Sequence, residues 1–162
     1  MTSHPKIIIY TDGACIGNPG PGGYGVIVTR NGEEQEFSAG FRQTTNNRME
    51  ILAAIVGLEA VKKPSQVTLY SDSKYLVDAI SKEWIYTWRN KQWKKGKIKN
   101  IDLWKRLLPL LEKHEVTVKW VKGHAGHTQN ERCDKLANRA AQGAQLPPDK
   151  GYEQGDPQTA MF

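Results

Sequence analysis

Long apolar runs and paired cysteines are both missing from this sequence. Its apolar runs are far shorter than the ~20 residues that a transmembrane helix needs, and residues 1–6 lack the basic and apolar regions of a signal peptide. The two cysteines, Cys15 and Cys133, lie far apart and in no CxxC pattern. These absences argue against a membrane protein and a disulfide scaffold, and we expect two reduced thiols in a cytoplasmic protein with no membrane partner.

Acidic residues are the scarcer charged class, with 17 against 23 basic residues and a net charge of +6. This balance fits a polyanionic partner, but the total charge alone does not identify one. The chain has 162 residues, of which 38% are hydrophobic, and these values suit one globular domain with a single core. We expect this domain to occupy residues 1–143 and to act as a monomer.

Hydrophobic periodicity and turn residues predict the element order βββαβαααβα. The expected strands are 6–11, 26–30, 33–41, 67–70 and 116–121. The expected helices are 47–62, 74–81, 84–93, one capped by Asn100 or Asp102, and 128–141. Strands separated by helices should pair in parallel, and the first hairpin antiparallel, so we predict an α/β fold with a mixed five-stranded sheet and helices on both faces. Residues 144–162 lack periodicity and are predicted to form a disordered tail.

Several local signals support these boundaries. Asn31-Gly32 is a two-residue hairpin turn. Residues 47–50 and 128–131 have the form of capping boxes, which predicts that helices begin there. Pro109 conflicts with the fourth helix because proline removes a backbone donor and clashes with the preceding turn. We expect a kink or an early end at that residue.

Residues 17–25 form a glycine-rich stretch that formally contains GxGxxG, through Gly20, Gly22 and Gly25. The dinucleotide fingerprint must open a helix, whereas a strand is predicted to follow here. The Gly-Lys-Ser/Thr of a P-loop is also absent. We interpret the stretch as a stiff loop that leads into the second strand.

Two predicted strands end alike, in a tyrosine, a hydroxyl residue and an aspartate. Asp12 follows strand 6–11, and Asp72 follows strand 67–70. Ligand sites in open α/β sheets form beyond the carboxyl ends of adjacent strands, so these side chains should meet. Glu50 and Asp134 lie in the first turns of two predicted helices. Four converging carboxylates are unfavourable without cations between them, and hard oxygen ligands suit Mg²⁺ or Mn²⁺.

Each acidic residue has a structural interpretation when it is taken singly. Asp12 can begin an Asp-Gly turn, and Asp72 can cap a helix. Glu50 can complete a capping box, and Asp134 can be a surface charge. Their joint placement, rather than any one of them, favours the metal site.

His124 and His127 form an HxxH pair near Cys133, so a zinc site must be weighed. These residues lack the spacing of structural zinc motifs, and the histidines lie in a glycine-containing loop. Histidine titrates near neutral pH, so a histidine beside the carboxylates suits proton transfer better. His124 is therefore a candidate catalytic residue.

The segment 84–101 carries many cations and tryptophans but no acidic residue. One interpretation is a solvated lysine face with tryptophans docked beneath it. The other is a nucleic-acid platform, with cations on phosphates and aromatic faces on sugars or bases. The residues concerned are Trp84, Trp88, Arg89, Lys91, Trp93, Lys94, Lys95, Lys97 and Lys99.

An ordered set of motifs between residues 6 and 141 resembles that of bacterial type 1 ribonuclease H. The motifs are residues 10–13, 17–25, 44–50, 70–73, 120–127 and 130–134. The resemblance implies a ribonuclease H-like fold. It also implies endonucleolytic cleavage of the RNA strand of RNA–DNA hybrids, leaving 5′-phosphate and 3′-hydroxyl ends.

The resemblance also assigns the site. The metal-binding carboxylates of the family match Asp12, Glu50, Asp72 and Asp134, and the family's loop histidine matches His124. In that mechanism two Mg²⁺ ions, about 4 Å apart, act in the substrate-bound state, and Mn²⁺ can replace them. Asp12 would bridge both ions, while His124 would help the product leave or shuttle a proton.

Substrate contacts carry over in the same way. Residues that match the readers of RNA 2′-hydroxyls are Cys15, Asn18, Asn47 and Glu50. Residues that match a pocket for a DNA-strand phosphate are Thr45, Asn46 and Asn100. Trp88 matches an aromatic that lies against a DNA sugar. The family's basic protrusion corresponds to a segment that includes Trp84, Arg89, Lys94, Lys95 and Lys97.

Two departures concern affinity rather than the reaction. Gln43 stands where family members carry an arginine, the neighbouring Arg42 should point elsewhere, and the basic protrusion is a few residues shorter.

Two alternative functions remain: another nuclease or polynucleotidyl transferase of the same fold, such as a resolvase or transposase, and a hybrid-binding module without catalysis. The first lacks this ordered set of motifs, and the second would gain nothing from four carboxylates facing a polyanion.

Overall fold

The structure, a computed structural model, describes residues 6–94, 98–122 and 127–154. A five-stranded sheet runs through the middle of the molecule in the order β3-β2-β1-β4-β5. Strands β1, β2 and β3 pair antiparallel, and β1, β4 and β5 pair in parallel, so the predicted mixed sheet is confirmed. The strands are β1 (Lys6–Cys15), β2 (Gly20–Arg30), β3 (Glu33–Thr44), β4 (Gln66–Ser71) and β5 (Glu115–Trp120).

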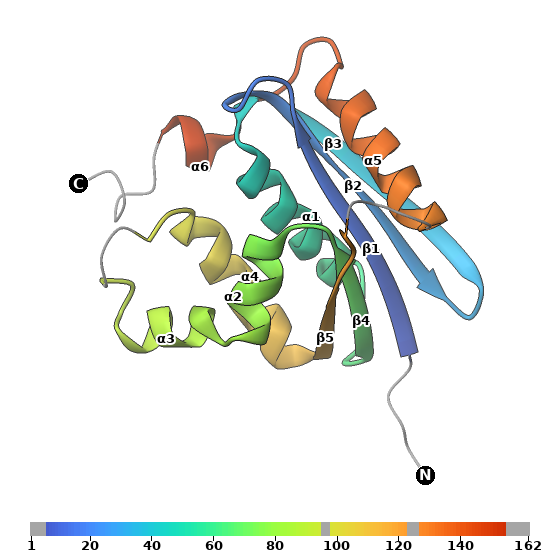
Figure 1. Ribbon diagram of the computed structural model, residues 1–162, viewed down its shortest axis with the longest axis vertical. Helices are drawn as coiled ribbons and strands as arrows, with labels where there is room; N and C mark the ends of the chain where they lie inside the picture. The colour runs from blue at the N-terminus through green and yellow to red at the C-terminus, as the bar shows by residue number, and fades with distance from the viewer. Residues whose placement is uncertain (1–5, 95–97, 123–126, 155–162) are drawn as a thin grey trace.

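Helices cover both faces of this sheet, as predicted (Figure 1). One face carries α5, and α1 to α4 gather on the other. In the described part of the chain, no helix combines the length and the apolarity needed to cross a bilayer. The helices are α1 (Asn46–Glu59), α2 (Lys74–Ser81), α3 (Trp84–Asn90), α4 (Ile101–Lys113), α5 (Thr128–Ala141) and α6 (Lys150–Glu153).

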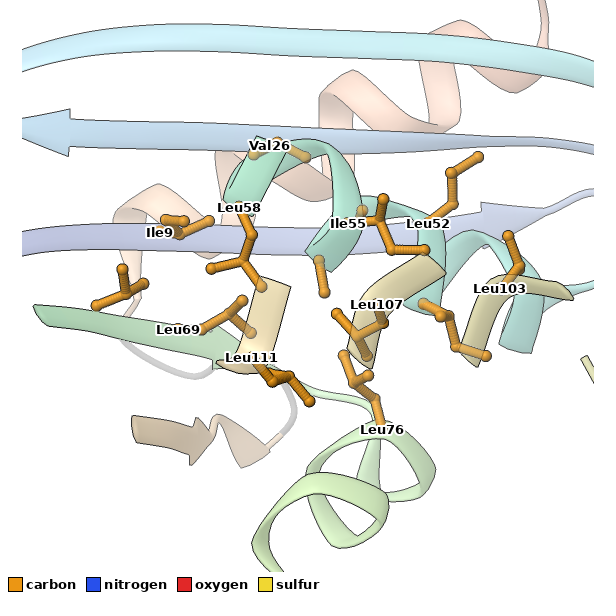
Figure 2. Close-up of a cluster of buried hydrophobic side chains, with 14 of the residues drawn as sticks. Ile9, Val26, Leu52, Ile55, Leu58, Leu69, Leu76, Leu103, Leu107 and Leu111 are labelled. Carbon is orange, nitrogen blue, oxygen red and sulfur yellow. The ribbon is translucent and has the colours of Figure 1, made fainter. Parts of the chain in front are cut away.

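The main core lies between the sheet and α1, which is itself covered by α4 (Figure 2). Ile9 of β1, Ile55 and Leu58 of α1 and Leu107 of α4 are fully buried in it. The small residues of α1 face the sheet: a Cβ added at Gly57 would lie 2.6 Å from Ile9 Cγ2. Removal of these apolar side chains from water supplies the main stabilisation.

Of the turns and helix starts predicted from local sequence, some are confirmed and others are wrong. Asn31 and Gly32 have φ angles of 51° and 80°, as a hairpin turn of type I′ requires. Ser73 caps α2, because its Oγ accepts a hydrogen bond from Leu76 N at 3.2 Å. The predicted start of α1 was wrong: Thr45, not Asn47, is the capping residue. The predicted capping box at residue 128 was also wrong, since α5 begins directly after His127.

Pro109 does not end α4, contrary to one of the two outcomes expected for it. The helix continues to Lys113, and Pro109 lies on its exposed side. The apolar residues Leu107, Leu108 and Leu111 are buried on its other side. Burial of these leucines outweighs the backbone hydrogen bond that proline removes.

Residues 17–19 of the glycine-rich stretch form the predicted connection into the second strand, but residues 20–25 already belong to β2, which begins at Gly20. Gly25 pairs with Asp12 across the sheet. A Cβ at Gly25 would lie 2.2 Å from Cys133 O of α5, so the helix rests directly on the glycine backbone. The absence of a side chain at Gly25 brings α5 against the sheet beside Asp12.

We expect Gly25→Ala to lower the free energy of unfolding by about 3 kcal/mol, because the added methyl meets backbone that cannot move alone. Urea denaturation at neutral pH measures this loss. Gly143→Ala is the matched control, since its Cβ would lie 3.2 Å from the end of the flexible Leu146 side chain. Equal stability of the two variants would contradict the close packing of α5.

The prediction of a disordered tail does not hold for residues 144–154. Pro147 O accepts a hydrogen bond from Arg42 N at 2.9 Å, and α6 follows. Asp149 is buried and accepts a hydrogen bond from Thr44 Oγ1 at 2.7 Å. These long-range polar contacts leave no trace in hydrophobic periodicity, which is why the sequence pattern missed them.

Candidate active site

Three of the predicted carboxylates meet at the edge of the sheet. The side-chain oxygens of Asp12, Glu50 and Asp72 lie within 4.8 Å of one another. Asp12 belongs to β1, Glu50 to the first turn and a half of α1, and Asp72 follows β4. Asp12 and Glu50 are buried, and Asp72 is half-buried. The structure thus brings together three of the four carboxylates that the sequence pattern predicted to converge.

The sequence pattern predicted that Asp12 stands at the end of its strand, but the structure places Asp12 within β1. The parallel pairing with β4 ends at Tyr10, whereas the antiparallel pairing with β2 continues to Cys15. Asp12 therefore lies where β1 has lost its parallel neighbour, which leaves room for other side chains. Its Oδ1 accepts a hydrogen bond from Gly13 N at 2.9 Å.

Backbone contacts hold the three carboxylates in place. A Cβ at Gly13 would lie 2.6 Å from Glu50 N, so glycine is what lets α1 bring Glu50 to β1. Thr11 Oγ1 donates to Tyr70 O at 2.8 Å, which ties β1 to β4. Trp120 Nε1 donates to Asp72 O at 3.2 Å. These contacts preorganise the cluster before any ligand binds.

Electrostatic repulsion within the cluster is strong. Burial, together with the nearby Asp72 and Asp134 carboxylates, raises the pKa of Asp12 to about 9. Burial and the charges of Asp12 and Asp72 also raise the pKa of Glu50 well above its ordinary value. Both shifts oppose the charged forms, so the protein alone does not stabilise this group of anions.

Asp134 approaches the cluster from the other face of the sheet. It lies in α5, is half-buried, and contributes to the raised pKa of Asp12. Asn138 Nδ2 donates to Asp134 Oδ1 at 3.0 Å and orients its carboxylate. The fourth predicted ligand is therefore adjacent to Asp12, although it lies outside the tight group of three.

Of the two histidines considered in the sequence, the structure describes only His127. His124 lies outside the described residues. His127 packs on Tyr70, with ring centroids 5.3 Å apart. The buried thiol of Cys133 donates to Tyr10 O at 3.3 Å, and burial raises its pKa. A buried, protonated thiol is a poor zinc ligand, so the structure does not favour the zinc alternative.

The carboxylate cluster fits a hard divalent cation. Glu50 Oε1 is buried and has no hydrogen-bond partner among the described residues. Such an atom is costly to bury unless a ligand satisfies it. Oxygen ligands from three or four carboxylates, of which Asp12 and Glu50 have raised pKa values without a cation, match the preferences of Mg²⁺ and Mn²⁺.

A pocket with a volume of about 520 Å³ lies at the start of α1, the helix that carries Glu50. Four predicted substrate-binding residues line it: Asn18, Thr45, Asn47 and Asn100. Asn46, a fifth, donates its backbone N–H to Asn18 Oδ1 at 3.0 Å. Cys15 is half-buried, and its thiol donates to carbonyl groups that include Thr44 O at 3.4 Å. The structure therefore gathers these predicted residues around the start of α1.

The predicted aromatic and basic residues lie on and after α3. Trp84 is 38% exposed, and its ring centroid lies 6.5 Å from that of the half-buried Trp88. Trp88 packs in turn on the fully buried Trp104, at 5.4 Å. Arg89 and Lys94 are exposed, and Arg89 pairs with Glu112 at 3.2 Å. Lys95 and Lys97 lie outside the described residues.

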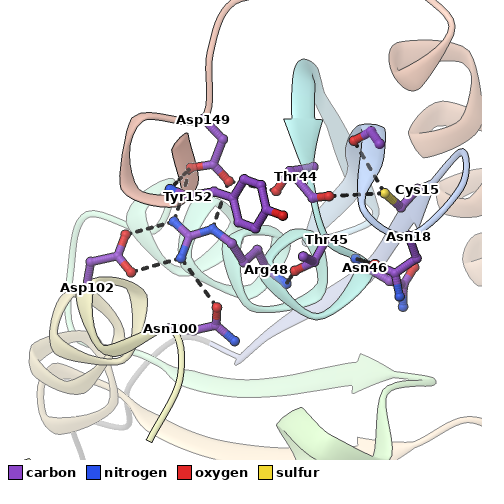
Figure 3. Close-up of polar contacts among 11 residues, drawn as sticks. Cys15, Asn18, Thr44, Thr45, Asn46, Arg48, Asn100, Asp102, Asp149 and Tyr152 are labelled. Carbon is purple, nitrogen blue, oxygen red and sulfur yellow. Dashed lines mark hydrogen bonds and ion pairs between the residues drawn. The ribbon is translucent and has the colours of Figure 1, made fainter. Parts of the chain in front are cut away.

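An ion network in the wall of the pocket was missed by sequence reasoning (Figure 3). Arg48 of α1 is 4% exposed and pairs with Asp102 at 2.7 Å and with Asp149 at 2.8 Å. Arg48 Nη1 also donates to Asn100 Oδ1 at 3.4 Å. The only signal in the sequence was a charged residue in the first turn of a predicted helix, and it named no partner.

Comparison with known proteins gives a consistent family. The RNase H family model matches residues 4–142. A ribonuclease H of Trichodesmium erythraeum is 56% identical over 151 residues, which cover 91% of this chain and 96% of the relative. A ribonuclease H of Rippkaea orientalis is 57% identical over 154 residues, which cover 93% and 94%.

Solved structures show the same fold. LC9-RNase H1, described as a type 1 RNase H with the type 2 active-site motif, matches with a TM-score of 0.78 and 31% identity over 99% of this chain and 86% of that one. LC11-RNase H1, solved in complex with an RNA/DNA hybrid, matches with a TM-score of 0.66 and 27% identity over 83% and 96%.

Proposed function

Because this chain belongs to the ribonuclease H family, we propose that it hydrolyses RNA in RNA–DNA hybrids at an active site that contains Asp12, Glu50 and Asp72. The reaction of the family is endonucleolytic cleavage of the RNA strand of a hybrid, and this chain is a nuclease of that class. The observation that carries the assignment of the site is the meeting of the three carboxylates within 4.8 Å. The complex of LC11-RNase H1 with a hybrid supports the substrate.

The carboxylates are the proposed ligands of two Mg²⁺ ions, for which Mn²⁺ can substitute. Asp12 feels the charges of both Asp72 and Asp134, so these carboxylates would hold the ions together with Glu50. When bound, the ions activate a water and offset the charge that develops on the leaving 3′-oxygen, which yields 5′-phosphate and 3′-hydroxyl ends. The hydrogen bonds of Thr11, Trp120 and Asn138 hold the ligands in place, so little reorganisation accompanies the reaction.

Selection of RNA over DNA is assigned to the start of α1 and to the turn between β1 and β2. Cys15, Asn18, Asn47 and Glu50 are proposed to read 2′-hydroxyl groups, which DNA lacks. Asn18 and Asn47 line one pocket at the start of α1, the helix that also carries Glu50, and this arrangement supports the role because a reader must lie close to the scissile bond. His124 is proposed to assist product release or proton transfer.

The test of this function is a comparison of substrates with one enzyme preparation. A labelled RNA–DNA hybrid should be cleaved in Mg²⁺, and it should remain intact with chelator. Duplex RNA and duplex DNA of the same sequence should remain intact under both conditions. Cleavage of duplex DNA at a similar rate would contradict the assignment and point to another nuclease of the same fold.

The second alternative, a hybrid-binding module without catalysis, is disfavoured by the same carboxylates. Buried anions that face a polyanion weaken binding unless cations separate them. We further infer a cytoplasmic monomer. Both cysteines are free, as expected in a reducing compartment, and one chain supplies all three of the clustered carboxylates.

The segment from Trp84 to Lys99 is proposed to hold the DNA strand through Trp84, Trp88, Arg89 and the lysines that follow. Replacing Lys94, Lys95 and Lys97 together with alanine should raise the Michaelis constant and flatten its dependence on salt concentration, since fewer counterions are then released. Steady-state kinetics at several salt concentrations measure both effects. An unchanged Michaelis constant and salt slope would assign these lysines to a solvated face.

A further inference from the structure

One wall of the pocket comes from the C-terminal segment, which we define as residues 147–153. Gly151 and Tyr152 of this segment line the pocket together with Thr45, Lys99 and Asn100. The pocket lies between segments that are distant in sequence: the start of α1, the start of α4 and the end of the described chain. The C-terminal segment therefore forms part of the pocket in which the substrate is proposed to bind.

Asp149 anchors the segment to the start of α1 (Figure 3). The carboxylate is 6% exposed and accepts hydrogen bonds from Thr44 Oγ1 at 2.7 Å and Arg48 Nε at 2.8 Å. Its Oδ1 also accepts a hydrogen bond from Tyr152 N at 3.3 Å, which begins α6. At the outer side, Arg42 pairs with Glu153 at 2.8 Å. These contacts fix the position of Tyr152 relative to Thr45.

Gly151 explains how closely the segment docks. A Cβ at this residue would lie 2.0 Å from Asp102 Oδ2 and 2.6 Å from Arg48 Nη2. The backbone at Gly151 therefore rests directly on the buried ion pair, and no other residue type fits there without movement. This contact leaves the next residue, Tyr152, beside the pocket.

The Tyr152 side chain has a free polar end at the pocket. Its hydroxyl points away from Asp149 and toward the side of Thr44 and Thr45 (Figure 3). Among the described residues, no hydrogen bond involves this hydroxyl. The nearby charge of Arg48 is balanced by Asp102 and Asp149, so it is committed to the ion network. Tyr152 and the exposed Lys99 remain as donors that a ligand can use.

We propose that Tyr152 is a further substrate-binding residue, which donates its hydroxyl hydrogen to a phosphate oxygen of the bound hybrid. Tyrosine hydroxyls are common partners of nucleic-acid phosphates. Asp149 is the positioning residue that holds Tyr152 at the pocket. The inference rests on the proposed function, because it takes the hybrid as the ligand.

Tyr152→Phe is the sharpest test, because it removes only the hydroxyl. We expect the Michaelis constant for the hybrid to rise about fivefold, the effect of one lost hydrogen bond. We expect kcat to stay within about twofold, since the contact is made equally in the bound substrate and in the transition state. The salt dependence of the Michaelis constant should not change, because no cation is lost. Gln154→Ala, an exposed neutral change directly after the segment, should behave as the wild type.

Gly151→Ala tests the docking of the segment. The added methyl should displace Tyr152 and raise the Michaelis constant at least as much as Tyr152→Phe does, with a lower melting temperature. An unchanged Michaelis constant in Tyr152→Phe would overturn the proposal, and so would a fall in kcat alone. If the wild-type enzyme fails to cleave the hybrid, the proposed function fails instead, so the two failures are distinguishable.

Discussion

Asp12→Asn is expected to lower kcat for hybrid cleavage by at least about a thousandfold, because it removes the carboxylate that the proposed metal site shares. Asparagine has the same shape but carries no charge, and it can still accept the hydrogen bond from Gly13 N. Hybrid binding, measured by gel shift or anisotropy in the same buffer, should largely survive. Single-turnover cleavage of a labelled hybrid in Mg²⁺ measures the loss.

The stability of the same variant gives a readout that does not depend on activity. The pKa of Asp12 is raised from 3.8 to about 9 when no cation is present. Ionisation of Asp12 therefore destabilises the native state as the pH rises through this window. Without divalent ions at pH 8, Asp12→Asn should melt at a higher temperature than the wild type, and Mg²⁺ should narrow the difference.

The control for both measurements is Asp78→Asn, which removes a carboxylate from α2 that lies 3.8 Å from Lys82. This variant should keep wild-type kcat and show no stabilisation at pH 8. Full turnover in Asp12→Asn would exclude Asp12 as a metal ligand. A lower melting temperature of Asp12→Asn in chelator would contradict the electrostatic account of the cluster.

Arg48→Met should lower the free energy of unfolding by about 3–5 kcal/mol, because it leaves the buried Asp149 carboxylate without its cation. This loss is a large share of the stability of an ordinary domain. Methionine keeps much of the apolar stem, so the effect reports the charge rather than a cavity. Urea denaturation at pH 7 measures it. The matched control is Arg106→Met, whose exposed pair with Glu59 should contribute less than about 1 kcal/mol.

The pH dependence of this variant identifies the group involved. Burial alone would raise the pKa of Asp149, but hydrogen bonds from Arg48 and Thr44 lower it below its usual range. The stability that this pair contributes is present above about pH 4 and is lost as the pH falls through the folded pKa. The difference in stability between wild type and Arg48→Met should therefore shrink in acid. A constant difference down to pH 3 would assign it to lost packing.

Much of the sheet and of the site was predictable, because the relevant signals are local. The β-branched run before Asp12 and its counterpart before Asp72 predicted two strands that carry carboxylates to one edge. Parallel pairing of those strands follows from the helix between them. The predicted capping residue of α1 was two positions too late. Thr45 and Asn47 are both good capping residues, and only the path of the preceding strand distinguishes them.

Other features depend on segments that meet only in the folded chain. The glycines of β2 were interpreted as a loop because nothing local shows that α5 packs onto Gly25. Pro109 was expected to disturb α4, but the leucines around it are buried together. The docking of residues 147–153 joins Asp149 to Arg48 across 101 positions of sequence, and a pattern of neighbouring residues carries no information on such a pair.

The sequence by itself determined the element order as far as α5, the mixed sheet, the four candidate carboxylates and the family, because each rests on residue type and short spacing. The tertiary structure decided which of the carboxylates form the tight group and that the C-terminal segment lines the pocket. It also decided that α1 and α5 pack closely on the backbone of glycines in the sheet. The physical reason is that burial and charge pairing are properties of surfaces brought together by folding, and several distant segments share each of them.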